Sequence, residues 1–408
     1  MRKITYWLAV ILIFIIPWED SISIEALGSL ARLIGLIVAV FWAATLLLEG
    51  RFRKPHLFHV LVLIFFLWNL ASVFWTPNTE ITLQRIKTYA QIFLLMLIYW
   101  EMFQKPKELV AGLQAYIFGA YVLIASTIYN YINGNVSVEY EGRYSATGVN
   151  AVDLSLILLL GLPIAMQLFF IANQNHKGII LKLVNLAYIP LSIFAVVLTG
   201  SRTSLIAVIP FGIYLVGTQQ IKFNQKLFGF GALLIALLAM LPLIPQNIIA
   251  RLGTLGASIG AGDLGGRVDL WQEGIAALAE QPITGIGGGA MDYKIGAAVH
   301  NTFISIVTET GFVGFGLFLS ILGLVIYKVS ILPRRTSGAM LTILMTWAIG
   351  VLSLSWEFRK ITWIILSFAI IESCFGEEAE RQSENIKFSG EIERPFETGE
   401  AAFGSSEI

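Results

Sequence analysis

The chain has 408 residues, of which 56% are apolar and only 13% are charged, and its formal net charge at pH 7 is zero. Its mean hydropathy of +0.76 lies far outside the range of soluble domains, so the composition excludes a soluble globular protein. The single cysteine, Cys374, excludes a disulfide framework and any cysteine metal cluster.

Long apolar runs separated by short polar breaks follow one another from the N-terminus. Because a bilayer core about 30 Å thick needs about 20 apolar residues per helix, each run is a candidate transmembrane helix. The predicted spans are residues 4–17, 27–48, 57–75, 83–103, 108–131, 150–172, 179–199, 203–217, 227–244, 302–327, 338–354 and 360–375. No small-x-small cleavage site follows the first run, so we expect a helix there rather than a signal peptide. The sequence thus predicts an all-α polytopic membrane protein with about 12 transmembrane helices over residues 1–375.

Basic residues near the span ends favour an N-terminus in the cytoplasm. In that orientation the outer side still carries several arginines close to span ends: Arg32, Arg85, Arg143, Arg202, Arg251, Arg267 and Arg359. Loops that are translocated against the positive-inside preference need a compensating reason. An anionic ligand at the outer face would supply one.

Arg202 interrupts an otherwise apolar stretch, residues 193–215, next to Gly200 and Ser201. We expect this position to be a boundary between two spans at the outer face, where the guanidinium reaches water or a ligand. The alternative is that Arg202 extends to lipid headgroups, as arginines near helix ends commonly do.

Residues 245–301 form one long extracytoplasmic loop before the tenth span, and loops of such length are functional or disordered. Apolar residues recur in it at helical spacing: Val268, Trp271, Ile275 and Leu278. We therefore predict a short amphipathic helix from about 267 to 280. Glycines at 285, 287, 288 and 289 then form a flexible turn, which either lets backbone approach a ligand or acts only as a hinge.

The loop ends at His300, and the next span begins with a polar stripe on one helical face. The stripe consists of Asn301, Ser305, Thr308 and Glu309. Because intramembrane ionisable groups are costly and face the bundle interior or a wet cavity, we expect the stripe to line a cleft. Glu309 is alternatively the structural partner of a buried arginine. For His300, proton transfer near neutral pH competes with a capping or packing role.

Two further segments have simple explanations. Asn150 and Asp153 fit a helix N-cap followed by a carboxylate three residues later. Residues 376–408 hold many glutamates without apolar periodicity, which is typical of a disordered, acidic cytoplasmic tail. The sequence also lacks metal-ligand, Walker and Rossmann patterns, so we expect no metal, no cofactor and no nucleic-acid partner.

Three segments stand in a recognisable order: GSRTSLIAV at 200–208, GRVDLWQEGIAALAEQPITGIGGG at 266–289 and HNTFISIVTETGFVG at 300–314. Together they resemble the O-antigen ligase and polymerase superfamily of bacterial membrane glycosyltransferases. Upstream, YSATGVNAVDLSLILLLGLPIA at 144–165 is similar to the segment that often opens the central half of this family. The layout of the whole chain also matches, which implies a GT-C-like fold.

The resemblance implies a specific activity. Family members transfer a glycan from an undecaprenyl-diphosphate carrier to an acceptor hydroxyl at the outer face of the bacterial cytoplasmic membrane, without metal and with inversion. Arg202 matches the arginine of the family's Ser-Arg motif, Arg267 matches its loop arginine, and Arg251 is a looser match. These three would bind the diphosphate, Ser201, Asn301 and Glu309 would line the site, and His300 would accept the proton of the hydroxyl.

The resemblance leaves the reaction's products open. O-antigen ligation onto a lipid A-core type acceptor, polymerisation of a surface polysaccharide or exopolysaccharide, and transfer of an oligosaccharide to protein hydroxyls share this motif order. The absence of a large soluble C-terminal domain disfavours some of the protein glycosyltransferases. An anion or solute transporter of the bicarbonate type and a non-catalytic envelope-assembly protein are the alternatives from other classes. Transport is disfavoured because the polar residues cluster at the outer mouth and no internal repeat is visible.

Overall fold

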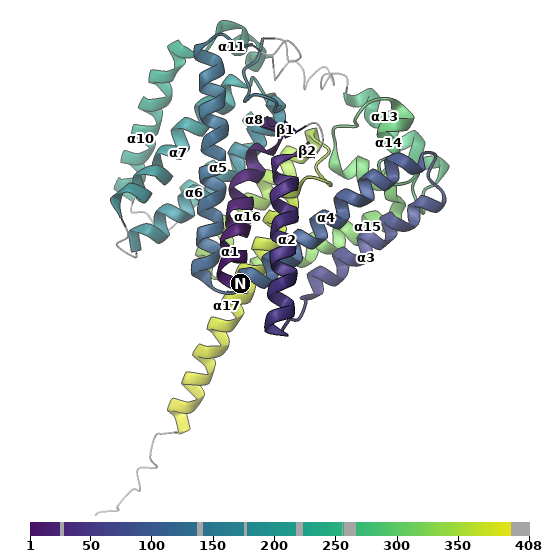
Figure 1. The fold of residues 1–408 in the computed structure, drawn as a ribbon. Coiled ribbons are helices and arrows are strands. Elements are labelled where there is room, and N and C mark those ends of the chain that lie inside the picture. The colour runs from purple at the N-terminus through teal and green to yellow at the C-terminus, as the bar shows by residue number, and fades with distance from the viewer. Residues whose placement is uncertain are drawn as a thin grey trace, which may run out of the picture.

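The computed structural model describes residues 1–24, 28–136, 142–174, 178–217, 223–254, 256 and 267–392. Within these ranges the chain is a bundle of long helices (Figure 1). The N-terminus and the end of the last helix lie at one end of the bundle in Figure 1, and α11, α13 and α14 lie toward the other end. We call the latter the outer end, following the orientation expected from the basic residues.

The first half of the chain contains seven long helices. They are α1 (Arg2–Ile15), α2 (Leu30–Glu49), α3 (Leu57–Ala71), α4 (Thr79–Met102), α5 (Pro106–Ile132), α6 (Ala151–Gln174) and α7 (Ile179–Leu198). Short 3-10 turns follow α1 and α3, namely η1 (Ile16–Ser21) and η2 (Ser72–Phe74). Two-residue strands, β1 (Ser23–Ile24) and β2 (Gly28–Ser29), pair antiparallel with Ser23 opposite Ser29 before α2 begins.

The second half is more irregular. Its elements are α8 (Arg202–Ala207), α9 (Ile209–Gly217), α10 (Phe223–Met240), η4 (Leu241–Leu243), α11 (Gln246–Gly253), α13 (Arg267–Glu280), α14 (Ala290–Ile295), α15 (Thr302–Ser330), α16 (Arg334–Gly350), η5 (Val351–Ser353) and α17 (Lys360–Ile392). The helix α13 occupies the range predicted for the amphipathic helix of the long loop.

Nine helices in the described ranges are long and apolar enough to cross a membrane, or ten if the bent pair that ends in α11 is one span. This confirms an all-α polytopic membrane protein. The total of about 12 spans stays a prediction, because the α8–α9 pair is shorter than a full span and α17 is not among the nine. The helix α17 also continues to Ile392, well into the segment predicted as a disordered tail.

Local chemistry sets several of the helix boundaries. The Asn78 side chain accepts a hydrogen bond from Ile81 N at 3.2 Å and so caps α4. Pro106 occupies the first turn of α5, where its missing N–H costs nothing, and the Glu108 carboxylate accepts the Lys105 N–H at 2.9 Å. Gly50 ends α2 in the left-handed conformation with φ of 60°.

The core of the bundle is built around α6, which is the most deeply buried of the candidate spans. Its closest neighbour is α7, and Tyr188 of α7 donates a hydrogen bond from its hydroxyl to Leu158 O at 2.9 Å. Gly161 lets this ring approach, because a Cβ there would collide with the Tyr188 phenol. At the periphery, side chains such as Leu47 are 86% exposed, which suits contact with lipid tails.

The helix α15 is broken at Gly311, whose φ of 64° and ψ of −173° are not helical. The segment after α13 inserts at this break and replaces the lost helical hydrogen bonds. Phe312 N donates to Pro282 O at 2.8 Å, while Gly287 N donates to Glu309 O at 2.9 Å. Residues 282–287, which begin with the Pro-x-x-Gly sequence, therefore bind α15 through their backbone (the α15 clasp).

This packing corrects our expectation for the glycines of the turn. A Cβ on Gly285 would collide with the Glu309 backbone, and one on Gly287 would lie 2.6 Å from Thr76 Cβ. Gly288 N donates to Ser72 Oγ at 3.0 Å. The glycines thus admit protein backbone and side chains rather than a ligand, and they are buried rather than free to hinge.

We expect Gly311→Ala to destabilise the protein strongly, because its backbone conformation is reserved for glycine and a Cβ would collide with Ile283 O. Strain of this kind costs about 1–3 kcal/mol before the collision is added. Gly316→Ala, also in α15 but with open space around its Cβ, is the matched control and should be neutral or stabilising by about 0.5–1 kcal/mol. Thermal unfolding in detergent measures both, and equal midpoints for the two variants would contradict the clasp.

Candidate functional site

Three arginines surround the turn between α7 and α8 at the outer end. Arg143 Nε donates to Thr199 O at 2.6 Å, and Arg251 Nε donates to Gly200 O at 3.3 Å. Arg202 Nε in turn donates to Arg251 O at 3.3 Å. Gly200 has a φ of 58°, and a Cβ there would lie 3.2 Å from the Arg251 side chain. The turn therefore needs glycine both for its conformation and for the close approach of Arg251.

The fourth arginine of this region, Arg267, begins α13. Burial lowers the pKa of Arg267, and the positive charge of Arg251 lowers it further. Arg267 in turn is among the groups that lower the pKa of His300. The structure thus brings Arg202, Arg251, Arg267 and His300 into one series of neighbouring groups, although they come from four separate segments of the chain. We call these four residues the outer basic cluster.

His300 has an unusual backbone conformation. Its φ is 51°, and it is the one non-glycine residue in the described ranges with a positive φ. Both of its neighbours are fixed: Trp271 Nε1 of α13 donates to Val299 O at 3.1 Å, and Asn301 Oδ1 accepts from Phe303 N and Ile304 N at the start of α15. Left-handed strain at a non-glycine residue persists only where its surroundings hold it, and it is concentrated at functional sites.

The imidazole of His300 is half-buried. Burial lowers its pKa from the usual 6.5, the charge of Arg267 lowers it further, and the carboxylates of Asp153 and Asp292 act in the opposite direction. A lowered pKa leaves the ring neutral at pH 7, with one nitrogen free to accept a proton.

Polar residues at the start of α15 hold the loop between α16 and α17. Thr302 Oγ1 donates to Leu354 O at 2.8 Å and accepts from Trp356 N at 2.7 Å, and Ser305 Oγ donates to Glu357 at 2.9 Å. One turn further, Thr308 Oγ1 donates to Gly274 O of α13 at 3.2 Å. The predicted polar stripe therefore anchors neighbouring segments, and Asn301 serves as the helix cap.

A second group of charges lies beside the glycines that follow the Pro-x-x-Gly sequence, because Gly288 and Gly289 are next to the Arg85 side chain. Arg85 of α4 forms an ion pair with Glu357 at 3.1 Å and contacts Asp292 at 3.7 Å. Its guanidinium also stacks over the Phe358 ring at 3.9 Å. Glu309, which is 1% exposed, interacts electrostatically with Arg85. The carboxylates of Glu309 and Glu357 each keep one buried oxygen without a hydrogen-bond partner.

This arrangement favours the interpretation of Glu309 as the structural partner of a buried arginine. The residue lies with a buried arginine, Arg85, and its charge is not among those that act on His300. Sequence reasoning named Arg85 only as an outer arginine and missed Glu357 and Asp292 as its partners. The signal available was the acidic and basic pair in SWEFRK, residues 355–360, between the last two spans.

Asp153 has a larger role than helix capping. Asn150 Oδ1 does accept the Val152 N–H at 2.8 Å, as a cap should. The Asp153 carboxylate, however, accepts from Trp356 Nε1 at 2.6 Å and forms an ion pair with Arg359 at 3.1 Å. It therefore links α6 to the loop before α17.

The remaining predicted site residue, Ser201, is buried in the turn before Arg202. Its backbone N–H donates to Thr199 Oγ1 at 3.2 Å, while its own Oγ is buried without a hydrogen-bond partner. The hydroxyl thus lies unsatisfied beside the outer basic cluster. Among the described residues, no three His, Cys, Asp or Glu side chains form a group that could hold a metal ion.

The four apolar residues that predicted α13 are not its most buried ones. Val268, Trp271 and Leu278 are half-buried. Gly274 and Ala277 are buried against the bundle, and Ile275 is 57% exposed. The cause is the close approach of α13 to α15, which only a small residue such as Gly274 permits, because a Cβ there would lie 3.0 Å from Ile304 Cγ2.

We expect Arg85→Met to destabilise the protein by about 3–5 kcal/mol, because it leaves buried carboxylates without a counter-charge. Arg85→Met/Glu357→Met should recover part of this loss, because it removes the stranded charge as well. Unfolding in detergent micelles provides the free energies, with Arg32→Met, at an exposed arginine, as the control. A double variant no more stable than Arg85→Met would argue against the ion pair.

The charge of Arg267 should be measurable at His300. The rate of His300 modification by diethyl pyrocarbonate, followed by peptide mass spectrometry, rises as the imidazole loses its proton, so its midpoint reports the pKa. We expect a midpoint below 6.5 in the wild type and a higher one in Arg267→Gln, because removing the cation makes protonation easier. Arg32→Gln should not move the midpoint. An unchanged midpoint in Arg267→Gln would show that the charge of Arg267 does not act on His300.

Comparison with known proteins identifies one part of the chain. Residues 187–319 match the family model described as O-antigen ligase, whereas a search of curated proteins finds no match. The matched residues extend from α7 into α15 and include all four members of the outer basic cluster. The match supports glycan transfer in the assembly of O-antigen or other surface polysaccharide. Residues 187–319 are therefore similar to the O-antigen ligase and polymerase superfamily.

Proposed function

We propose that the protein transfers a glycan from an undecaprenyl-diphosphate-linked donor to an acceptor hydroxyl, without a metal ion and with inversion at the sugar. The observation that carries the proposal is the outer basic cluster. In it Arg202, Arg251 and Arg267 are neighbours in turn, and Arg267 is next to His300, which has a positive φ. All four lie within the part of the chain that matches the O-antigen ligase family.

The arginines suit a diphosphate. Guanidinium groups bind phosphate oxygens through paired hydrogen bonds and keep their charge at any relevant pH. Like charges held together repel one another, as the effect of Arg251 on the pKa of Arg267 illustrates. A bound diphosphate would relieve this repulsion, and the same charges would stabilise the negative charge that develops on the leaving group.

His300 is suited to act as the general base. Its lowered pKa keeps the imidazole neutral near pH 7, the form that accepts a proton. In the proposed step the acceptor oxygen attacks the anomeric carbon as its proton passes to His300. The bond between that carbon and the diphosphate oxygen breaks, and the diphosphate leaves with the electron pair. Attack opposite the leaving group inverts the configuration.

The same proposal places the protein in the bacterial cytoplasmic membrane with the site facing the periplasm. Its support is the position of the outer basic cluster, whose turns and loop lie at the end of the bundle away from the N-terminus (Figure 1). There the cluster would meet a lipid-linked donor in the outer leaflet and a glycan or lipid A-core type acceptor. Membrane lipids would surround the exposed apolar faces of the helices.

An in vitro transfer assay tests the reaction. Purified protein, a diphosphate-linked lipid glycan and extracted envelope acceptors are incubated with chelator, and release of undecaprenyl diphosphate is measured. His300→Ala should lower the rate by about 10²–10⁴-fold, as expected for loss of a general base. Arg267→Ala should lower it by about 10²–10³-fold, as for loss of one electrostatic stabiliser.

The matched control is Arg32→Ala, which removes an exposed arginine near the start of α2 and should retain wild-type activity. Full activity in His300→Ala would remove the proposed base. If the wild type released no undecaprenyl diphosphate from any donor, but proteoliposomes accumulated bicarbonate, the protein would be an anion transporter instead.

A further inference from the structure

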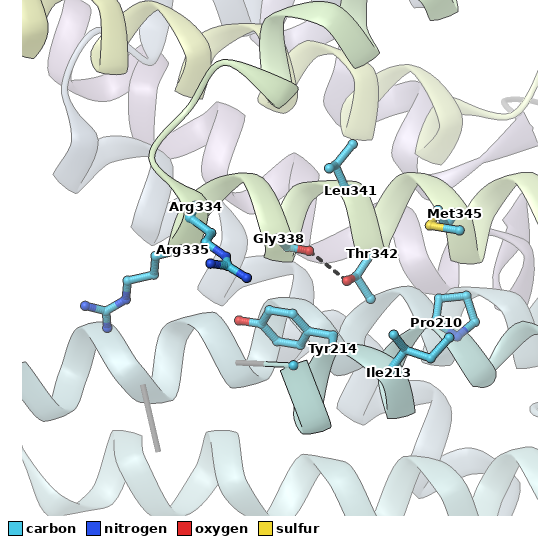
Figure 2. Close-up of a pocket in the computed structure, with 10 residues that line it drawn as sticks. Pro210, Ile213, Tyr214, Arg334, Arg335, Gly338, Leu341, Thr342 and Met345 are labelled. Atoms are coloured by element: carbon cyan, nitrogen blue, oxygen red, sulfur yellow. Dashed lines mark hydrogen bonds between the residues drawn. The ribbon is translucent and has the colours of Figure 1, made fainter. Parts of the chain in front are cut away.

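A groove between α9 and α16 lies away from the outer basic cluster. Its volume is about 450 Å³. On α9 it is lined by one helical face, Pro210, Ile213, Tyr214 and Gly217, and on α16 by Arg334, Arg335, Gly338, Leu341, Thr342 and Met345. Figure 2 shows Tyr214, Ile213 and Pro210 of α9 beside Gly338, Thr342 and Met345 of α16.

The two ends of the groove differ in chemistry. In Figure 2 the guanidinium groups of Arg334 and Arg335 and the hydroxyl of Tyr214 lie toward one end, and Pro210 and Met345 lie at the other. The long axis between them is lined by apolar side chains. A ligand with one anionic end and one apolar end would therefore match the groove along its length.

The positive end contacts an aromatic ring, since the Arg335 guanidinium lies 5.7 Å from the centroid of Phe170. Within the described residues, neither Arg334 nor Arg335 forms an ion pair. Both arginines occupy the first turn of α16, where the helix dipole already favours anions, and that turn contains no acidic residue. Pro333 precedes the helix without a side-chain cap. Among the described residues, the two arginines thus have no carboxylate partner.

The apolar part of the groove opens to the surroundings of the bundle. Ile213 is 65% exposed and Met345 is 56% exposed, so both apolar side chains face the surroundings of the bundle. Free phosphate would use only the arginines and leave these side chains uncovered. An acyl chain would cover them at the same time as a phosphate meets the arginines.

We propose that the groove binds an anionic phospholipid of the leaflet nearest the N-terminus, which is the cytoplasmic leaflet in the expected orientation. The phosphate accepts hydrogen bonds from Arg334, Arg335 and Tyr214, and one acyl chain lies along Ile213, Leu341 and Met345. The proposal does not rest on the glycosyltransferase activity, because the groove is a separate site that contains no residue of the outer basic cluster.

The site has a structural consequence. The groove runs along the contact between α9 and α16. In the segments next to them, α8 and η5, Thr203 Oγ1 and Ser353 Oγ share a hydrogen bond of 2.8 Å. Thr203 follows Arg202, and Ser353 leads into the loop that carries Glu357. A lipid that fills the groove would fix the inner ends of these segments, and it should therefore raise the temperature at which the protein unfolds.

The test compares binding of phosphatidylglycerol with phosphatidylcholine by native mass spectrometry and by thermal unfolding of the delipidated, full-length protein. We expect wild type to prefer phosphatidylglycerol and to be stabilised by it. Arg334→Gln/Arg335→Gln should weaken phosphatidylglycerol binding by about tenfold or more and abolish the stabilisation. The matched control, Lys3→Gln/Arg51→Gln, removes the same charge from exposed positions elsewhere at that end and should leave binding intact.

A second variant fills the groove without changing its charge. A Cβ at Gly338 would lie 3.5 Å from the Tyr214 ring, so Gly338→Leu fits the backbone but occupies the space of the acyl chain. It should weaken binding to a similar extent while both arginines remain. Unchanged phosphatidylglycerol binding in either groove variant, or an equal loss in the control, would overturn the proposal.

Discussion

The break in α15 at Gly311 is the constraint on which the rest of the site depends. A helix interrupted inside a membrane protein must find new partners for its freed backbone groups, because lipid supplies none. Here residues 282–287 supply them. Since these residues connect α13 to α14, the clasp fixes both helices against the bundle. Arg267 at the start of α13 and His300 before α15 are positioned as a result.

The charges near the outer end form two groups with different physical roles. Arg85 is buried among carboxylates, and removing water from opposite charges requires that they be paired. The outer basic cluster instead gathers like charges around Gly200 and His300. Like charges held close together repel one another, as the effect of Arg251 on the pKa of Arg267 illustrates. The first group therefore suits a structural role, and the second is the group to which the proposed function assigns the diphosphate.

The elements of the bundle could be predicted well from sequence because hydrophobic length and terminal signals dominate in a membrane. The predicted span 179–199 corresponds to α7, Ile179–Leu198, and the predicted helix 267–280 corresponds to α13. The packing of α13 could not be predicted, since the apolar period favoured a face containing Ile275. Glycine proved decisive there, because Gly274 allows α15 to approach more closely than any larger residue would.

By itself, the sequence determined that the chain is a polytopic helical membrane protein and where most of its long helices lie, because both follow from local composition and spacing. It also singled out Arg202, Arg267 and His300 through their motifs. Only the tertiary structure decided that Arg85 belongs with Glu357, that the glycine turn clasps α15, and that Arg202, Arg251, Arg267 and His300 are neighbours. These relations join residues distant in the chain, and an arginine carries the same local signal whether its partner is a carboxylate of the protein or a phosphate of a substrate.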